Sequence, residues 1–270
     1  MTLQVTFTAA SPDVARHPRR LLGFASLLRY ALGRWWATRY WLGQLLLWTA
    51  LVGGILAAAL WGTPEGPNPA GLVSDRVAEA TRGMVLAFGI VASIGALVAA
   101  QGVLLGERQD GTLAWVLSLP VSRASVVLAK ALAHGGGLLV TAMAVQGVLA
   151  GVLLRARLGP AIPSGLLTVA VALFALHLLF YLSLALLLGT LVPSRGWVVA
   201  IGVLVLLAQE IALDALGPLG ELLPSALTKH LAQPLLASQP VNSGIPILAT
   251  LGWIVLCLVG AAWRLERADL

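Results

Sequence analysis

Residues 106–130 read GERQDGTLAWVLSLPVSRASVVLAK and form the longest polar interval between two strongly apolar runs. Glycine at 111 and proline at 120 are predicted to break the backbone. Between these breaks, residues 112–119 predict a helix of about two turns with an exposed apolar face. Ser122 is a good N-cap for the helix that follows. A short helix across the ends of two longer helices is suited to docking a partner, and an ordinary connector is the alternative interpretation.

The composition is typical of a membrane protein. The chain has 270 residues, of which 59% are hydrophobic and only 10% are charged, whereas soluble domains carry about 25% charged residues. The net charge of +6 does not indicate nucleic-acid binding, because the basic residues form no stripe with interleaved polar groups. The single cysteine, Cys257, lies in an apolar run and excludes an internal disulfide.

Six apolar runs are long enough to cross a bilayer, at about 41–61, 83–105, 131–154, 166–192, 197–216 and 245–263. The third helix is expected to begin near Ser122 and to protrude beyond its span. Residues 62–82 are expected to form a Pro- and Gly-rich loop. Prolines divide residues 217–244 into pieces too short to span, which predicts a re-entrant outer segment before the last span; a packed outer loop is the alternative. The fold class is therefore all-α, with one transmembrane domain over residues 1–270.

Residues 19–40 predict an amphipathic helix that lies at the membrane surface. The apolar face holds Leu21, Phe24, Leu28, Leu32 and Trp35, and most of the other face is polar, with Arg19, Arg29 and Arg34 placed to meet anionic lipid. A plain juxtamembrane anchor is the alternative, and both descriptions are compatible. Residues 1–18 lack an apolar core, so no cleaved signal peptide is expected.

The distribution of basic residues predicts the topology. Six spans place both termini on the same side of the membrane, and twelve of the 17 Lys and Arg residues fall on that side or in its loops. Because loops rich in Lys and Arg stay in the cytoplasm, both termini and residues 106–130 are predicted to be cytoplasmic. The expected location is the cytoplasmic membrane of a bacterium or archaeon.

No catalytic chemistry is predicted. The sequence has no G-x-x-x-x-G-K-[ST] loop for ATP phosphates and no H-E-x-x-H motif, and its four histidines lack the spacing of metal ligands. The chain is therefore expected to be no enzyme and to hold no cofactor or metal.

A few polar residues inside the spans are candidates for a substrate path, since ionisable groups deep in a bilayer are expensive. Phe174, His177 and Tyr181 share one helical face. The favoured alternative is that His177 bonds to a neighbouring helix. Glu210 and Asp214, one turn apart near the outer end of the fifth span, could attract a cationic substrate, and simple solvation at the interface is the alternative.

The stretch that opens this section resembles the loop between the second and third spans of ABC-2 type exporter permeases. The matching residues are Glu107, Gly111, Thr112, Leu113, Leu117, Ser118, Leu119, Pro120, Val121, Ser122, Arg123 and Lys130. Family members often carry Glu after the Gly-Thr-Leu, where this chain has Ala114. The order of the spans extends the resemblance over the whole chain.

The resemblance implies a permease subunit of an ATP-binding cassette (ABC) exporter, with a substrate that is amphipathic, such as a drug, peptide or lipid-like molecule. The implied partners are a separate ABC ATPase subunit, which holds ATP and magnesium, a second copy of the chain or a homologous permease, and the bilayer. Helix 112–119 would be the cytoplasmic coupling helix and residues 19–40 the elbow helix. The expected coupling residues are Glu107, Arg108, Gly111, Thr112, Leu113, Trp115, Val116, Leu117, Pro120 and Arg123. The alternative is a self-contained secondary transporter or channel.

Overall fold

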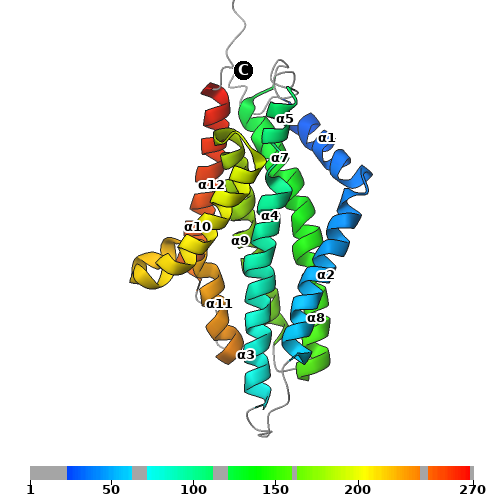
Figure 1. The fold of residues 1–270 in the computed structure, drawn as a ribbon, viewed down its shortest axis with the longest axis vertical. Helices are drawn as coiled ribbons and strands as arrows, with labels where there is room; N and C mark the ends of the chain where they lie inside the picture. Colours follow the sequence, from blue (N-terminus) through cyan, green and yellow to red (C-terminus); the bar gives the residue numbers. More distant parts are fainter. Residues whose placement is uncertain (1–22, 63–71, 112–120, 160–162, 238–242, 268–270) are drawn as a thin grey trace, which may run out of the picture.

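The computed structural model describes residues 23–62, 72–111, 121–159, 163–237 and 243–267, and all regular elements in these ranges are helices. They pack along one another in an elongated bundle (Figure 1). Six of the described helical segments are long and apolar enough to cross a membrane: Tyr40–Trp61, Asp75–Gln109, Arg123–Leu158, Ser164–Leu191, Arg195–Ala215 and Gly244–Arg267. The predicted all-α fold with six spans is confirmed.

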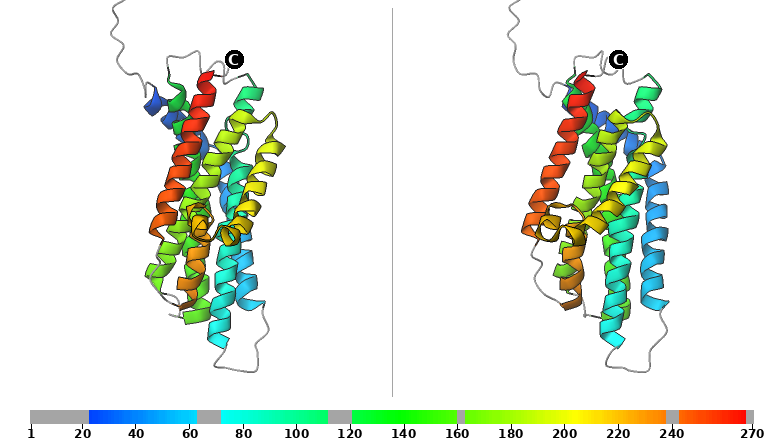
Figure 2. Two further views of the ribbon diagram at one scale, coloured as in Figure 1. Left: turned by 90° about the vertical axis from the view of Figure 1, so that its left-hand side faces the viewer. Right: turned by 60° about the vertical axis from the view of Figure 1, so that its left-hand side comes forward.

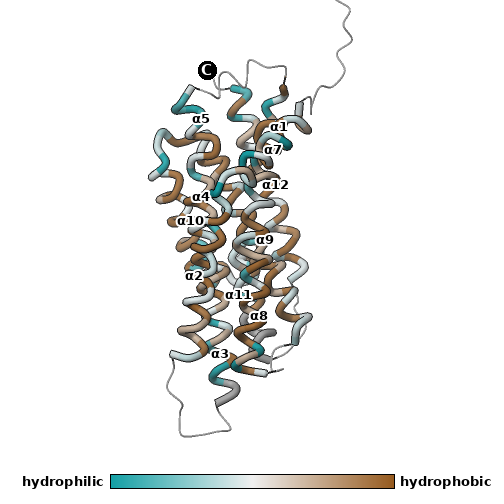
Figure 3. Tube along the Cα trace, turned by 90° about the vertical axis from the view of Figure 1, so that its right-hand side faces the viewer, coloured by the Kyte–Doolittle hydropathy of each residue, from teal (hydrophilic) through white to brown (hydrophobic). Residues whose placement is uncertain are grey.

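The two ends of the bundle differ in what they hold. One end, at the top of Figure 1, contains α1 (Phe24–Ala37), α5 (Leu105–Gln109) and the C-terminal end of α12 (Gly244–Arg267). We call it the inner end, after the predicted topology. The outer end contains the end of α2 (Tyr40–Trp61) and the start of α3 (Leu72–Met84). Hydrophilic segments gather near both ends, around α5 and α3, and apolar segments predominate between them (Figure 3).

Two long helices, each containing a π-helical segment, flank residues 112–120. The second span continues from α3 through the π-helix η1 (Val85–Val91) into α4 (Ala92–Ala100), and α5 follows. The third continues from α7 (Arg123–Leu138) through the π-helix η2 (Leu139–Ala144) into α8 (Val145–Leu158). Segments with i→i+5 hydrogen bonds are rare and usually short.

The loop prediction for residues 62–82 is wrong from residue 72 onward, because α3 begins at Leu72. Val77, Ala80 and Met84 recur at helical spacing and are buried, and α3 packs against α2 and α11. The prolines and glycines that suggested a loop over residues 62–82 all precede Leu72. The charged residues of this segment masked an amphipathic helix.

Helix α9 (Ser164–Leu191) is the centre of the bundle and packs against α4, α7, α8, α11 and α12. Much of its surface is buried, since its sequence is apolar all round. Elsewhere small residues set the spacing. A Cβ atom at Gly95 would lie 2.0 Å from the ring of Trp48, so only glycine lets α2 and α4 approach this closely.

The fifth span does not reach the outer end as one helix. Helix α10 (Arg195–Ala215) ends part-way along the bundle, the 3₁₀ helix η4 (Gly217–Leu222) turns aside, and α11 (Ala226–Ala237) continues toward the outer end (Figure 2). Residues 217–237 thus form short helices, as the prolines predict, and α11 packs against α3 and α9. Residues 238–242 lie outside the described ranges. Whether this region is re-entrant in the bilayer stays a prediction.

Candidate functional site

The two ends of the predicted coupling stretch lie next to each other at the inner end. Helix α5 is followed by Gly111, whose φ of +69° is in the left-handed region that favours glycine. On the other side, the Ser122 hydroxyl accepts a hydrogen bond from the Ser125 backbone N–H at 3.1 Å and caps α7, as the sequence predicts. The predicted helix itself lies outside the described residues, together with Thr112, Leu113, Trp115, Val116, Leu117 and Pro120.

An ion pair joins the two sides of this stretch. The Lys130 ammonium lies 2.6 Å from the Glu107 carboxylate and donates a hydrogen bond of 2.9 Å to the Val103 carbonyl. The sequence analysis named Glu107 and Lys130 as motif residues but did not predict that they pair. Because both side chains are largely buried, the bonds of Lys130 fix the first turn of α5, and Val103 two residues before it, to α7.

Arg123, a predicted coupling residue, fastens the start of α7 to another helix. Its guanidinium donates a hydrogen bond to the Leu265 carbonyl near the end of α12. That carbonyl belongs to the last turn of α12 and has no partner further along the helix. Arg108 is exposed at the surface of α5. Of these two predicted coupling residues, Arg108 is therefore an exposed cation, whereas Arg123 holds two helices together.

Helix α1 packs along α7 and meets the coupling stretch at its exit. A Cβ atom on Gly23 would lie 2.4 Å from Val121, and one on Gly137 would lie 2.1 Å from the Trp35 ring. The start of α1 thus packs on Val121, two residues before α7, and its end packs on α7 itself. The Trp35 ring is buried and also contacts His134 edge-on, with 5.2 Å between ring centroids.

The predicted faces of α1 are present, with one difference. Phe24, Leu28 and Leu32 are half-buried, whereas Arg29 and Arg34 are exposed, and Arg19 lies outside the described residues. Trp35, predicted on the apolar face, is fully buried and not half-buried like the others, because its ring fills the notch at Gly137. The exposed aromatic rings near the α1–α2 junction are instead Tyr30, Trp36 and Tyr40.

Three of the residues proposed for a substrate path, Phe174, His177 and Tyr181, are buried inside the bundle. Phe174 stacks on Phe88 with 5.6 Å between centroids, and Tyr181 contacts His177 edge-on at 5.0 Å. A His177 ring nitrogen lies 3.1 Å from the carbonyl of Pro224, which precedes α11. The favoured alternative, a histidine that bonds to a neighbouring segment, matches this geometry. A role in substrate transfer stays a prediction.

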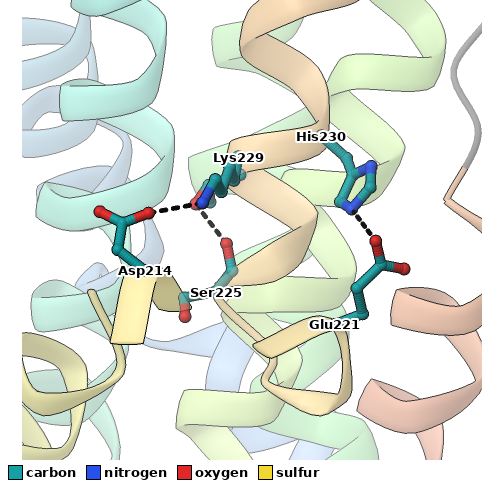
Figure 4. A network of polar contacts seen from close by, with 6 residues as sticks. Asp214, Glu221, Ser225, Lys229 and His230 are labelled. Atoms are coloured by element: carbon teal, nitrogen blue, oxygen red, sulfur yellow. Dashed lines mark hydrogen bonds and ion pairs between the residues drawn. The ribbon is translucent and has the colours of Figure 1, made fainter. Parts of the chain in front are cut away.

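Asp214, near the end of α10, lies at the break with α11 (Figure 4). Asp214 accepts a hydrogen bond of 2.6 Å from the Lys229 ammonium, and a His230 ring nitrogen lies 3.4 Å from Glu221. Both pairs are substantially exposed on the isolated subunit, and Glu210 lies one turn before Asp214. A water-filled or partner-covered surface suits such groups better than lipid chains.

No group of three or more His, Cys, Asp and Glu side chains in the described ranges could hold a metal ion.

Residues 49–270, which are most of the chain, match the family of ABC-2 family transporter proteins. The chain belongs to the ABC-2 transporter family. Comparison with curated proteins gave no match. Members of this family are membrane subunits of ABC transporters and associate with an ABC ATPase, so the chain is a multi-pass permease.

Several residues that shape the inner end of this ABC-2 permease were missed from sequence. Arg195, the first residue of α10, reaches across Gly102 and Gly106 of the second span, with its guanidinium within 4 Å of a Cβ built on either glycine. Gln109 holds the segment just before it by donating to the Pro193 carbonyl at 3.1 Å. Only the small residues four apart hinted at a close approach here.

Proposed function

We propose that this permease is the transmembrane subunit of an ABC exporter, and that it works as a dimer of two six-span subunits driven by separate ATPase chains. The second subunit is another copy of this chain or a homologous permease. The substrate class that fits best is amphipathic: a drug, a peptide or a lipid-like molecule. The ATPase subunits bind the ATP and magnesium and act from the cytoplasm on the inner end.

The observation that carries this proposal is the way the segments on either side of residues 112–120 are anchored. The ion pair of Glu107 and Lys130 joins the helices on either side, and Arg123 ties α7 to α12. A push on the stretch between α5 and α7 would therefore act on several spans at once. A flexible connector would need none of these bonds.

A self-contained secondary transporter fits less well. Such proteins use ion-binding or proton-relay groups near the middle of the membrane, often at broken helices. The described permease does have a broken helix, but His177 at this depth is buried and bonded to the Pro224 carbonyl. The exposed Asp214 is paired with Lys229.

The test is reconstitution of the chain with a cognate ABC ATPase in proteoliposomes. We expect Trp115→Ala to reduce recovery of the complex, since aromatic anchors dominate docking energies. Glu107→Ala and Pro120→Ala should leave the complex assembled but hydrolyse ATP without transport. Trp197→Ala is the matched control, because it removes an exposed tryptophan near the inner end but outside the stretch.

Two results would contradict the proposal. One is wild-type assembly, hydrolysis and transport in all three variants, which would leave residues 107–120 as a connector. The other is ATP hydrolysis by the purified chain alone, which would place the nucleotide site on the permease itself.

A further inference from the structure

A cavity of about 530 Å³ opens at the inner end between α1, α4, α5, α7 and the start of α10. Its volume lies within the range of small-molecule sites, about 300–1,000 Å³. Apolar side chains make up part of its wall, among them Leu27, Ala31, Val103, Val126 and Ala129. The exposed Tyr30 and Arg34 stand on its α1 side.

Some charged groups that line the cavity form ion pairs and others do not. Lys130 and Glu107 face it but pair with each other. Arg34 from α1 and Arg195 from the start of α10 also line it, and in the described part of the chain neither guanidinium makes an ion pair or hydrogen bond. Asp110 is the other carboxylate in the lining, so three cations stand against two acids.

The two arginines are held in place by the fold. Arg34 lies one residue before Trp35, whose ring is locked against Gly137. The Arg195 guanidinium lies over Gly102 and Gly106. The residues just before Arg195 are bonded to α5, because the Gln109 side chain donates a hydrogen bond to the Pro193 carbonyl. Guanidinium groups are suited to bidentate binding of phosphate oxygens and are weakly hydrated, so two of them facing one cavity favour an anionic ligand.

We propose that this cavity binds the headgroup of an anionic phospholipid from the adjacent leaflet. Arg34 and Arg195 bind the phosphate, and the apolar wall receives the first part of the acyl chains. The location supports a lipid, because the cavity lies beside an amphipathic helix at an end of the apolar bundle, where headgroups are found. The proposal does not depend on the direction of transport or on the substrate.

The experiment is titration of the full-length permease in detergent with short-chain phosphatidylglycerol, with bound lipid counted by native mass spectrometry. Phosphatidylcholine and inorganic phosphate are the comparison ligands. We expect saturable binding of phosphatidylglycerol, with phosphatidylcholine binding at least about tenfold more weakly. Arg34→Gln and Arg195→Gln should each raise the apparent Kd about tenfold, the change expected for the loss of one charge-assisted contact.

Arg39→Gln is the matched control, because it removes an exposed arginine near the end of α1 that does not line the cavity. It should bind phosphatidylglycerol like the wild type. Equal affinity for both lipids, or unchanged binding in the Arg34 and Arg195 variants, would overturn the proposal. Displacement by inorganic phosphate at the same concentration as the lipid would also overturn it, in favour of a free anion. Equal elution volumes without ligand will show that the variants are folded.

Discussion

At the scale of single residues, the inner end is organised by Lys130. Its ammonium contacts Glu107 and the Val103 carbonyl, so one side chain of α7 satisfies two groups of the neighbouring segment. Removing one partner from a largely buried ion pair costs more than removing an exposed charge, because the remaining ion stays poorly solvated. A substitution at position 107 is therefore the most direct way to test whether the ion pair is needed for coupling separately from assembly of the complex.

We predict that Glu107→Gln lowers the free energy of unfolding by about 1–3 kcal/mol and reduces transport per ATP hydrolysed. The amide keeps the shape of the carboxylate but leaves the Lys130 ammonium without its counter-ion. Denaturant unfolding in detergent and coupled assays in proteoliposomes measure the two effects. Asp110→Asn removes an exposed carboxylate three residues away and should stay within about 0.5 kcal/mol of the wild type. Equal behaviour of the two variants would show that the ion pair is not a structural link.

At the scale of elements, α1 is fixed to α7 by the Trp35 ring, which packs into the gap left by the missing side chain of Gly137. The Trp35 ring occupies the space that a Cβ on Gly137 would need, at 2.1 Å, whereas a Cβ on the adjacent Gly136 would meet nothing within 4 Å. This pair of glycines offers a controlled test, because both lie in the same helix and bear the same change in helix propensity.

Gly137→Ala should displace the ring and lower stability by about 1–3 kcal/mol, the usual cost of overpacking. Gly136→Ala should be neutral or stabilising by up to about 1 kcal/mol, since alanine suits a helix better than glycine. Thermal unfolding and tryptophan fluorescence report both changes. If the two alanine variants unfold at the same temperature, α1 is not locked by Trp35.

At the scale of the whole molecule, the break between α10 and α11 marks a face that is unsuited to lipid. The exposed ion pair of Lys229 and Asp214 and the contact of His230 with Glu221 lie there beside exposed leucines such as Leu219 and Leu222. In the proposed dimer this face would meet the partner subunit or the substrate path. Residues of α12 near Trp253 lie at about the same depth along the bundle as this face, because the Trp253 indole donates a hydrogen bond of 3.0 Å to the Leu222 carbonyl.

We predict that Glu221→Cys in membranes reacts with a charged, water-soluble thiol reagent, whereas Val255→Cys does not. Val255 is exposed on α12, two residues from Trp253, and should face lipid chains at a similar depth. The native Cys257 is buried and serves as the background. Labelling that is equal at both positions would show that the α10–α11 face has no water-filled or partner-covered environment of its own.

Local patterns predicted much of this architecture. The lengths of the apolar runs gave six spans, and the Ser122 cap and the faces of α1 followed from spacing within a single helix. The contacts that shape the inner end could not be predicted in this way. Glu107 and Lys130 are brought together by how two helices align, and the contact of Arg195 with Gly102 depends on a turn more than 90 residues further along the chain.

The π-helical segments η1 and η2 change which residues share a face along the second and third spans. A π segment winds an extra residue into a helix without adding a matching length, so the apolar pattern changes phase where it occurs. Each surplus residue corresponds to about 100° around the axis. A helical wheel drawn without interruption from α3 through Val85–Val91 into α4 therefore rotates the residues of one of the two α-helices by this angle away from their true face. Positions counted back from Glu107 and positions counted forward from Leu72 belong to two separate wheels.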